Sequence, residues 1–461
     1  MITITLNNNR GIISVETQKE FKIVKALREA LRVKNPNAFF LRRHMPKGWD
    51  GYQYYVTDKG GFSAGMYPQV CAFLEQEEVK YRVIDDRLLT DFNEKLKLKL
   101  KGQEYRGYQN DAMKAIIENE VGGISFIRGI VKAATNAGKT MLMAGIYDIT
   151  KVKTIILVNN TDLFNQMVYD DFPKLIPNKF GYMQGAKLVW GDVMVCMAQT
   201  LIKRLEDFKI KRILGEYGAV LVDEGDLSDN KTYKKILNSL HTTFIRLAFS
   251  GSIFVSDLAK YKMKNQNIKS FFGELLFDIS NLELIEAGFS SPILIVINKG
   301  NTKEYELSSY DDEYMKAIIK SRSRNKRIVS RIKFHMAKGR DKFLITVKLK
   351  KHVDYLYEIL KEEFGDKYTI NYVEHTNKNR KKIIDKFKAG NTNILISSMI
   401  VKRGINFPLM QVMINAASGL SPENSLQLLG RATRKHESKK ITYFEDFFDE
   451  GFYVKRHSRR R

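Results

Sequence analysis

The strongest restriction on the fold comes from short apolar runs that recur from near residue 100 to about residue 447. Each run is rich in β-branched residues and nearly continuous in hydrophobicity, as is typical of strands buried on both faces of a parallel sheet. Stretches with helical spacing lie between them, and in VDYLYEILKEEF the residues Val353, Leu356 and Leu360 fall on one face. This alternation predicts α/β units with right-handed crossovers. The runs are GIVKA, KTIILVN, DVMVCMAQ, YGAVLVDEG, FIRLAFSGS, PILIVIN, KFLITV, NILISSM, QVMINAA and KITYFEDF.

The runs form two series, separated by a polar stretch from Asn298 to Tyr314. We therefore predict two tandem α/β domains, each built on a parallel sheet and preceded by a small α+β domain. A chain of 461 residues is long enough for about three domains. The expected divisions are 1–95, 96–290, 291–452 and a disordered basic tail, 453–461.

The charge balance favours a polyanionic partner. The chain has 77 Lys and Arg against 52 Asp and Glu, a net charge of +25, and basic surface gains affinity by releasing counterions from nucleic acid. A protein that is merely basic is the alternative reading. Cys71 and Cys196 are far apart, which excludes a disulfide framework and a zinc site. With no signal-like N-terminus and no apolar run of about 18 residues, we expect no membrane span and a cytoplasmic location.

A phosphate-binding loop is predicted at Ala133–Thr140, which reads AATNAGKT and follows a strand-like run. The pattern fits A/G-x4-G-K-S/T. Small residues such as Thr135, Asn136, Ala137 and Gly138 let backbone N–H groups curl around phosphates at a helix N-terminus. In this arrangement Lys139 reaches the β- and γ-phosphates and Thr140 holds Mg²⁺. The motif alone does not exclude a chance match.

An acidic pair follows the run AVLV at Asp223 and Glu224. Ligands of open parallel sheets bind at the carboxyl ends of the strands. Asp223 is therefore a candidate Mg²⁺ ligand together with Thr140, and Glu224 a candidate base that orients and deprotonates the attacking water. An acidic turn without a catalytic role is the alternative.

Two arginines lie three residues apart in SLQLLGRATRK, at Arg431 and Arg434, and share one face of a predicted helix. A guanidinium directed at the γ-phosphate stabilises charge in the transition state. A solvated basic helix is the alternative.

In this order, the motifs resemble those of superfamily two helicases and translocases, over roughly residues 102–450. YRGYQNDAM resembles the adenine-reading motif, with Arg106 and Gln109, and ATNAGKT resembles motif I. LVNNTDLFNQM, VCMAQTL, VDEGD and AFSGS match motifs Ia, Ic, II and III in position, while FLITV, ISSMIVKRGINFP and QLLGRATR resemble motifs IV, V and VI.

The resemblance implies two RecA-like domains, ATP and Mg²⁺ as cofactors, and arginine fingers at Arg431 and Arg434. It places Gly404 and Asn406 at the nucleotide. It also implies that polar groups grip one DNA strand through its phosphates, without a sequence code. The implied DNA-binding residues are Asn159, Gln199, Thr200, Thr346, His375, Ser397 and Ser398.

Two further stretches are similar to the UvsW-type and XPB-like DNA helicases. Phe271–Ile295 resembles the segment that enters their second motor domain, and the stretch from Gly48 to Arg87 resembles their duplex-contacting module. Phage recombination helicases of the UvsW type act in branch migration and remodel forked DNA, so the implied partner is single-stranded, forked or branched DNA, bound by a monomer in the host cytoplasm. Trp49 is expected either to contact DNA or to form the core of this module.

The chain departs from the family pattern at several positions. Asp226 replaces the usual His of motif II, Asn159-Asn160 replaces Pro-Thr in motif Ia, and Asn406 replaces an Asp near the ribose. These departures leave two alternatives open. One is a related engine, either a duplex translocase of a restriction system or an RNA helicase. The other is a nucleic-acid-binding clamp with a degenerate motor.

Overall fold

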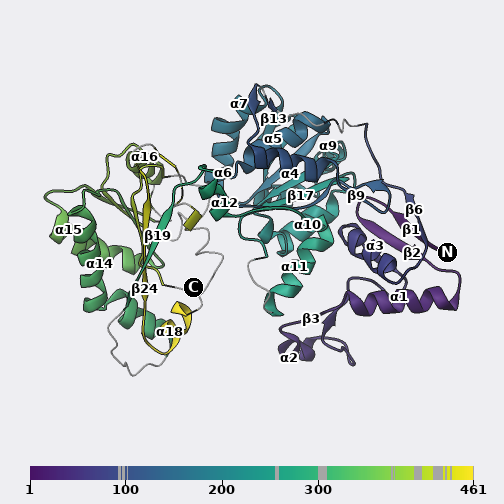
Figure 1. Cartoon of the computed structure of the whole chain (residues 1–461), viewed down its shortest axis with the longest axis horizontal. Coiled ribbons are helices and arrows are strands. Elements are labelled where there is room, and N and C mark those ends of the chain that lie inside the picture. Colours follow the sequence, from purple (N-terminus) through teal and green to yellow (C-terminus); the bar gives the residue numbers. More distant parts are fainter. Residues whose placement is uncertain are drawn as a thin grey trace. The chain divides into compact units, whose positions relative to one another are not determined.

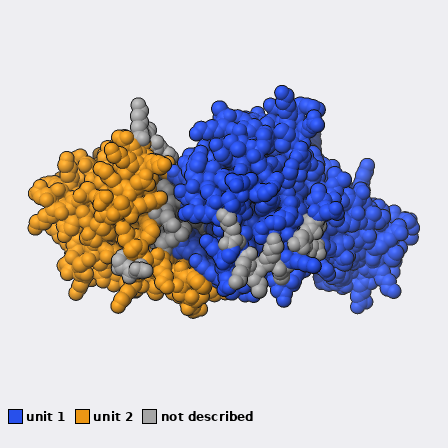
Figure 2. All heavy atoms as spheres, turned by 90° about the horizontal axis from the view of Figure 1, so that it is seen from above, with its two compact units in different colours: residues 1–280 blue, residues 281–461 orange. Residues whose placement is uncertain are grey.

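The computed structural model describes residues 1–91, 95, 99–100, 102–254, 259–299, 309–374, 377, 379–398, 407–418, 429–430, 433, 435–436 and 439–459. The chain divides into two compact units, residues 1–280 and residues 281–461, which are coloured separately in Figure 2. Across the described ranges, no helix is long and apolar enough to cross a membrane. Cys71 and Cys196 are both buried and free.

The first unit is built around a sheet in the order β14-β13-β15-β12-β16-β17-β11-β18. Its neighbouring strands are parallel, apart from β13 and β14. The apolar runs become central strands because both of their faces are covered. On one face, side chains of α8 to α11 pack with Ile155, Leu157, Val220 and Val222 in one core cluster. The strands are β11 (Arg128–Ala133), β12 (Thr154–Val158), β13 (Phe180–Gln184), β14 (Lys187–Val189), β15 (Val193–Met197), β16 (Ala219–Asp223), β17 (Ile245–Ser250) and β18 (Leu275–Ile279).

The connecting segments of this sheet are mostly helical, as the alternation of patterns predicts. Two short antiparallel pairs precede β11: β7 (Lys99–Leu100) with β8 (Gln103–Glu104), and β9 (Glu120–Val121) with β10 (Ile124–Ser125). The helices are α4 (Gly107–Ile117), α5 (Lys139–Thr150), α6 (Thr161–Asn165), the π-helical η3 (Gln166–Asp171), α7 (Phe172–Leu175), α8 (Ala198–Arg204), α9 (Phe208–Leu214), the 3₁₀ turn η4 (Gly225–Leu227), α10 (Lys231–Ser239) and α11 (Ala259–Phe272).

The N-terminal residues of the same unit form a small α+β module with a four-stranded sheet in the order β5-β2-β1-β6 (Figure 1). Helix α1 begins with a capping box, in which Thr17 and Glu20 satisfy each other's backbone N–H groups. Its elements are β1 (Ile2–Leu6), β2 (Arg10–Ser14), α1 (Gln18–Ala30), β3 (Val33–Lys34), α2 (Ala38–Leu41), η1 (Arg42–His44), β4 (Tyr52–Gln53), β5 (Gly61–Ser63), η2 (Ala64–Met66), α3 (Tyr67–Gln76) and β6 (Tyr81–Asp85).

The turn between β1 and β2 docks the module onto the large sheet. Arg128, from the start of β11, donates to the Asn8 carbonyl at 2.9 Å and to the Phe271 carbonyl at 3.0 Å. Arg246, from the start of β17, donates to the Asn9 side chain. Both guanidinium groups are almost fully buried, and burial lowers the pKa of each. The module therefore covers two cations that the large sheet carries.

The second unit contains a parallel sheet in the order β19-β24-β23-β20-β22-β21. Its central strands are fully buried, and helix α15 adds its apolar face to the core, as its spacing predicts. Its elements are α12 (Asn281–Glu286), β19 (Ile293–Lys299), α13 (Tyr310–Glu313), the π-helical η5 (Tyr314–Ile319), α14 (Arg322–Met336), β20 (Phe343–Val347), α15 (Lys350–Phe364), β21 (Ile370–Val373), α16 (Arg380–Lys388), β22 (Ile394–Ser398), β23 (Val412–Asn415), β24 (Thr442–Phe448) and α18 (Tyr453–Ser458).

The C-terminal residues differ from the expected disordered tail. Tyr453–Ser458 form helix α18, and Val454 is fully buried within a cluster that includes Tyr314 and Ile318. The Glu313 carboxylate accepts from the N–H groups of Tyr453 and Val454 at 2.7 and 3.3 Å. The apolar anchor and this cap hold a segment whose composition alone is typical of a solvated tail. The parallel sheets and their order establish the predicted α/β fold with two RecA-like domains.

Candidate active site

Three motifs meet at one edge of the large sheet because the strands that precede them are neighbours. The sheet order places β17 between β16 and β11, and the register pairs Asp223 with Phe249 and Lys132 with Ser250. These pairs lie at the carboxyl ends of parallel strands, the edge where such sheets bind ligands. The predicted phosphate loop, the Asp223–Glu224 pair and the serines of AFSGS are therefore brought together.

The phosphate loop links β11 to α5, and Gly138 forms the N-cap of that helix with φ +77°. A Cβ atom at Gly138 would lie 2.4 Å from Gln109 Nε2, so both the backbone conformation and the available space require glycine. Asn136 also has a positive φ, at +78°. Lys139 is the first residue of α5, and its ammonium donates to the Ala133 carbonyl at 3.3 Å. A tight loop at a helix N-terminus is suited to phosphate.

The segment before α4 fastens this loop. The buried Gln109 amide donates to the Ala137 carbonyl at 3.0 Å, and its oxygen accepts from the Arg106 N–H at 3.0 Å. Arg106 also donates to the Asn136 carbonyl at 3.0 Å, and the Tyr108 hydroxyl donates to Ala137 at 3.1 Å. In this structure Arg106 and Gln109 position the loop. Contact with adenine stays a prediction.

The acidic pair follows β16. Asp223 is buried, and burial raises the pKa of its carboxyl to about 6, although the nearby Lys139 ammonium opposes the rise. Glu224 has φ +54°, a conformation that is strained for a residue with a side chain. Its N–H donates to Asp223 Oδ1 at 3.0 Å. A buried carboxylate beside an ammonium, next to a strained acidic residue, is typical of a functional site.

Asp226, which replaces the usual His, is bonded to motif III. The Ser250 hydroxyl donates to Asp226 Oδ1 at 3.1 Å and accepts from the Ser252 N–H at 3.1 Å. Close backbone packing supports this bond. A Cβ atom at Gly225 would lie 2.7 Å from that of Ala248. Motifs II and III are thus directly connected in spite of the substitution.

The predicted DNA-binding residues of the first unit lie in different settings. Asn159 follows β12, and its buried side-chain oxygen has no hydrogen-bond partner within the described chain. Gln199 is exposed on α8. The Thr200 hydroxyl accepts from the Gly185 N–H at 3.0 Å and so holds the turn between β13 and β14. The Trp49 indole is half-buried and donates to the Tyr52 carbonyl at 3.0 Å.

The predicted DNA-binding residues of the second unit are buried. Thr346 lies within 3.4 Å of the Ile414 carbonyl and of the Asn415 side chain. The Ser397 hydroxyl donates to the Ser398 carbonyl at 2.8 Å, and both serines are buried at the end of β22. The remaining predicted residues, His375, Gly404, Asn406, Arg431 and Arg434, lie outside the described residues.

Two contributors to this site were missed at the sequence level. Tyr108 holds the phosphate loop, and its signal was the aromatic residue inside YRGYQ. Ser250 holds Asp226, and its signal was the polar residue that ends the apolar run FIRLAFS. In each case only the tertiary contact reveals the role.

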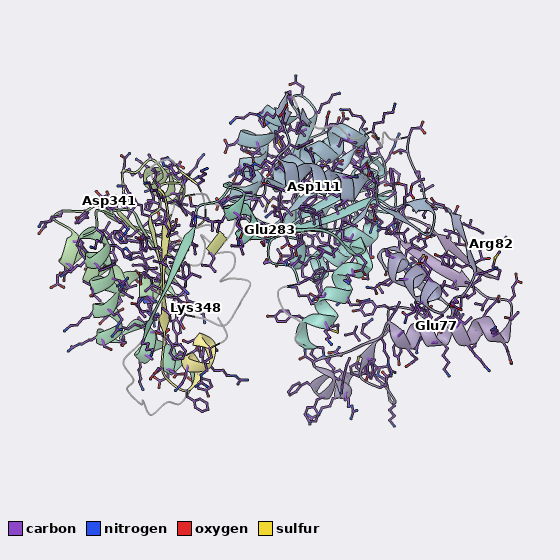
Figure 3. All side chains as sticks on the ribbon, in the orientation of Figure 1. Glu77, Arg82, Asp111, Glu283, Asp341 and Lys348 are labelled. Atoms are coloured by element: carbon purple, nitrogen blue, oxygen red, sulfur yellow. The ribbon has the colours of Figure 1, made fainter. Side chains whose placement is uncertain are left out.

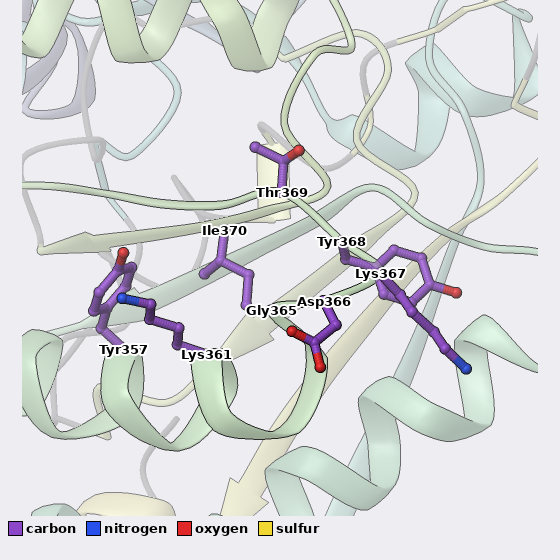
Figure 4. Close-up of a pocket in the computed structure, with 8 residues that line it drawn as sticks. All are labelled: Tyr357, Lys361, Gly365, Asp366, Lys367, Tyr368, Thr369 and Ile370. Carbon is purple, nitrogen blue, oxygen red and sulfur yellow. The ribbon is translucent and has the colours of Figure 1, made fainter.

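A separate cavity of about 300 Å³ lies in the second unit, at the end of α15 (Figure 4). Tyr357 and Lys361 extend from α15, and Asp366, Lys367 and Tyr368 belong to the segment that leads to β21. None of the described nucleotide-site residues lines it. The cavity is distinct from the candidate active site.

Two family models match the chain. The Type III restriction enzyme, res subunit family matches residues 103–254, and the helicase conserved C-terminal domain family matches residues 324–436. The first match contains the phosphate loop, the acidic pair and motif III. A strand-end site of this kind, followed by a second RecA-like domain, defines a nucleotide-driven motor.

Known proteins resemble the chain over most of its length. The Saccharomyces cerevisiae protein IRC3 is 26% identical over 74% of this chain, and the aligned part is 51% of IRC3. The DNA 3'-5' translocase XPB2 of Sulfurisphaera tokodaii is 23% identical over 80% of this chain and 86% of XPB2. The crystal structure of bacteriophage T4 UvsW is 19% identical and aligns over 97% of this chain and 90% of UvsW, with a TM-score of 0.45.

Residues 103–254 and 324–436 thus carry the two conserved domains of superfamily two helicases. The chain spans about half the length of IRC3.

Proposed function

We propose that this chain is an ATP-dependent DNA helicase or translocase of the UvsW and XPB-like group, which acts as a monomer on forked or branched DNA. The observation that carries the proposal is the meeting of the Lys139 loop, the Asp223–Glu224 pair and Ser250 at one sheet edge. The similarity to XPB2, named as a DNA translocase, and the net charge of +25 support DNA as the partner.

The residues present suit Mg²⁺ and ATP. The described residues contain no cluster of three or more His, Cys, Asp or Glu for a metal ion, and Mg²⁺ in such sites takes one or two carboxylates together with the phosphates. Asp223 and Thr140 would hold the ion, which supplies charge neutralisation to the phosphates when bound. Burial destabilises the charged form of the Asp223 carboxyl, and a bound cation would offset that penalty.

Side chains and backbone groups of the chain would perform the remaining steps. Lys139 and the loop N–H groups bind phosphate, and Glu224 accepts a proton from the attacking water. Arg431 and Arg434 are proposed to stabilise transition-state charge, and Gly404 and Asn406 to contact the nucleotide. Asn159, Gln199 and Thr200, with His375 and the ends of β20 and β22, are proposed to face the DNA strand. For Thr346, Ser397 and Ser398 that role requires an opening of the buried strand ends.

ATP hydrolysis should be measured with forked, four-way, duplex and single-stranded DNA and with RNA, together with strand separation. We expect forked and four-way DNA to stimulate hydrolysis most. Lys139→Ala should abolish both activities, because it removes the charge at the γ-phosphate. Lys187→Ala, at an exposed position on β14, is the matched control and should retain both.

The alternatives give different results in the same assay. Preference for RNA would replace DNA as the partner. Equal stimulation by unbranched duplex and by forks would favour a duplex translocase, which the match to the restriction-subunit family supports. Activity on branched DNA that survives Lys139→Ala would indicate a clamp and contradict the proposal.

A further inference from the structure

An arm projects from the N-terminal module between β3 and β4, residues 33–53. Its stem is the antiparallel pair of β3 and β4, in which Val33 faces Gln53 and Lys34 faces Tyr52. The Asn35 N–H donates to the Gly51 carbonyl at 2.8 Å and extends the stem. Helix α2 and the turn η1 form the tip. In Figure 1 this tip lies away from the β1-β2-β6 sheet, beyond the free end of the stem.

The tip exposes a pair of aromatic side chains. Phe39 is 82% exposed and Phe40 is 74% exposed, and their rings meet edge to face with centroids 5.5 Å apart. Met45, in the same tip, is 40% exposed. Figure 3 shows side chains extending outward from the ribbon around α2. Single exposed apolar residues are ordinary, but an exposed apolar patch on a projection marks an interaction site.

Exposed basic residues follow these rings along the arm. Arg42, Arg43, His44 and Lys47 are all exposed, and the arm contains four Lys or Arg against one Asp. An uncharged apolar partner would satisfy the rings alone. Cations beside flat aromatic rings complement a polyanion with flat apolar faces, which is a nucleic-acid strand with an accessible base.

The arm is rigidly mounted on the first unit. Inside it, the Trp49 indole donates to the Tyr52 carbonyl, and Arg32, directly before the arm, places its guanidinium over the Tyr52 ring at 4.2 Å. At its base, the Tyr55 hydroxyl donates to Asn267 Oδ1 at 2.7 Å and lies 3.2 Å from the Met263 carbonyl, both on α11.

A further bond leads from α11 towards the active site. Asn267 donates to Asp229 Oδ1 at 2.7 Å, and Asp229 lies three residues beyond Asp226. Two side-chain hydrogen bonds thus link Tyr55, two residues beyond the arm, to the segment that follows motif II. A stacking surface that is fixed to the motor itself can resist the duplex while the motor pulls on one strand.

We propose that the arm places Phe39 and Phe40 against the bases where a duplex opens, while Arg42, Arg43 and Lys47 neutralise the adjacent phosphates. This assignment rests on the proposed function and adds to it the element that separates the strands. Trp49 then has a structural role inside the arm, and the two phenylalanines make the contact.

The test uses the full chain and a forked DNA with 5-iodouracil as the first base at the opening. The wild-type chain should form a photo-crosslink at Phe39 or Phe40, which is identified by mass spectrometry. The double variant F39A/F40A should bind the fork at least tenfold more weakly, because two stacking contacts are lost, and should lose strand separation. F39W/F40W should bind within about threefold of wild type, since tryptophan also stacks.

Phe208→Ala is the matched control, because Phe208 is 79% exposed but lies on α9. Single-stranded DNA should still stimulate ATP hydrolysis in F39A/F40A to within about twofold. The variant R42Q/R43Q should lower the salt dependence of fork binding by a slope of about two, since two phosphate contacts are lost.

Fork binding by F39A/F40A equal to that of Phe208→Ala, or a crosslink that maps elsewhere, would overturn the proposal. Loss of sedimentation with anionic phospholipid vesicles, with unchanged fork binding, would assign the arm to a membrane instead. Failure of the proposed function gives a different result: DNA would not stimulate ATP hydrolysis by the wild-type chain. The crosslink can then be repeated on a forked RNA.

Discussion

Asp223, the proposed Mg²⁺ ligand, lowers the stability of the fold, because its carboxyl is buried without a bound cation. The pKa of this carboxyl is 3.8 in the unfolded chain and about 6 in the fold. Between these values the folded state binds more protons than the unfolded state, so the free energy of unfolding falls as pH rises from about 4 to 6. The penalty is complete above pH 6.

Asp223→Asn should therefore stabilise the chain in the absence of nucleotide while it abolishes ATP hydrolysis. At pH 7.5 the gain is at most about 3 kcal/mol, from a pKa shift of about two units, and it should shrink by about 1.4 kcal/mol at pH 5. Chemical denaturation of both proteins at both pH values measures it. A variant less stable than wild type at pH 7.5 would contradict the burial argument.

Ser250 forms the described bond between motif III and Asp226. Ser250→Ala should leave ATP hydrolysis within about threefold of wild type and reduce strand separation at least tenfold. The reason is that the buried Asp226 oxygen loses a donor, which costs about 1–3 kcal/mol and loosens the connection. Ser250→Thr keeps the hydroxyl and should behave as wild type. Equal loss of both activities in Ser250→Ala would show that the bond serves hydrolysis alone.

The backbone geometry of a site could be predicted where it depends on a local motif. The order of Gly138, Lys139 and Thr140 indicates a phosphate loop because that loop needs small residues, a cation and a hydroxyl in sequence. The burial of Thr346 and Ser397 could not be predicted, because a polar residue at the end of an apolar run can face either the ligand or the core. Only the neighbouring strands decide between these positions.

At the scale of elements, helix α15 carries a buried imidazole that makes its unit sensitive to acid. His352 is fully buried, and within the described chain neither ring nitrogen has a hydrogen-bond partner. Burial, with a smaller effect from Arg324, lowers the pKa of this imidazole to about 3 from 6.5. The unfolded chain binds the proton first, so stability is complete above pH 6.5 and falls as pH decreases towards 3.

The second unit should thus lose about 2 kcal/mol of unfolding free energy from this group between pH 7.5 and pH 5. His352→Leu should remove that part of the pH dependence. His44→Gln, at an exposed position, should leave it unchanged. Circular dichroism during denaturation at the two pH values compares the variants, and an unchanged slope in His352→Leu would show that another group is responsible.

The contact between the arm and α11 gives a second prediction at this scale. Tyr55→Phe removes the hydroxyl that bonds Asn267 and Met263, so strand separation should fall about fivefold while DNA-stimulated ATP hydrolysis is retained. Tyr54→Phe makes the same chemical change, but the Tyr54 hydroxyl bonds Asp50 within the arm. A similar effect of both substitutions would indicate general destabilisation of the arm.

Elements with a regular hydrophobic pattern could be predicted from the sequence. Elements that depend on contacts with residues far away in the sequence could not. The apolar runs became strands because their length and β-branched content fit only a buried sheet. Helix α18 was expected to be disordered, because its stability depends on Glu313 and on the burial of Val454 rather than on its own composition. The arm has no period at all, and the aromatic and basic residues in NAFFLRRHM were its only signal.

At the scale of the whole molecule, the N-terminal module and the first motor sheet share one compact unit. The bond from Arg128 to Asn8 spans 120 residues, and that from Arg246 to Asn9 spans 237 residues. Such contacts leave no pattern in the sequence, because each partner looks like an ordinary surface residue in its own segment. The two-sheet architecture was predictable, whereas this docking was not.

Removal of residues 1–95 should therefore destabilise the motor rather than isolate it. The deletion exposes Phe126, Val121 and Ile124, which pack in the core of the module, and removes the bonds of Arg128 and Arg246 to Asn8 and Asn9. We expect the fragment 96–461 to aggregate or to melt well below the full chain. A fragment that melts like the full chain would refute this expectation.

The contact of Asn8 and Asn9 with the two buried arginines also restricts which parts of the chain can vary independently. The N-terminal module cannot be exchanged for another without a change in the motor sheet, because Arg128 and Arg246 at the starts of β11 and β17 bond to its Asn8 and Asn9. Substitutions should be tolerated more easily at the tip of the arm, where Phe39, Phe40 and the basic residues are exposed. Substrate preference among relatives should therefore change first between residues 38 and 47, while the Asn7–Asn9 turn changes only together with the starts of β11 and β17.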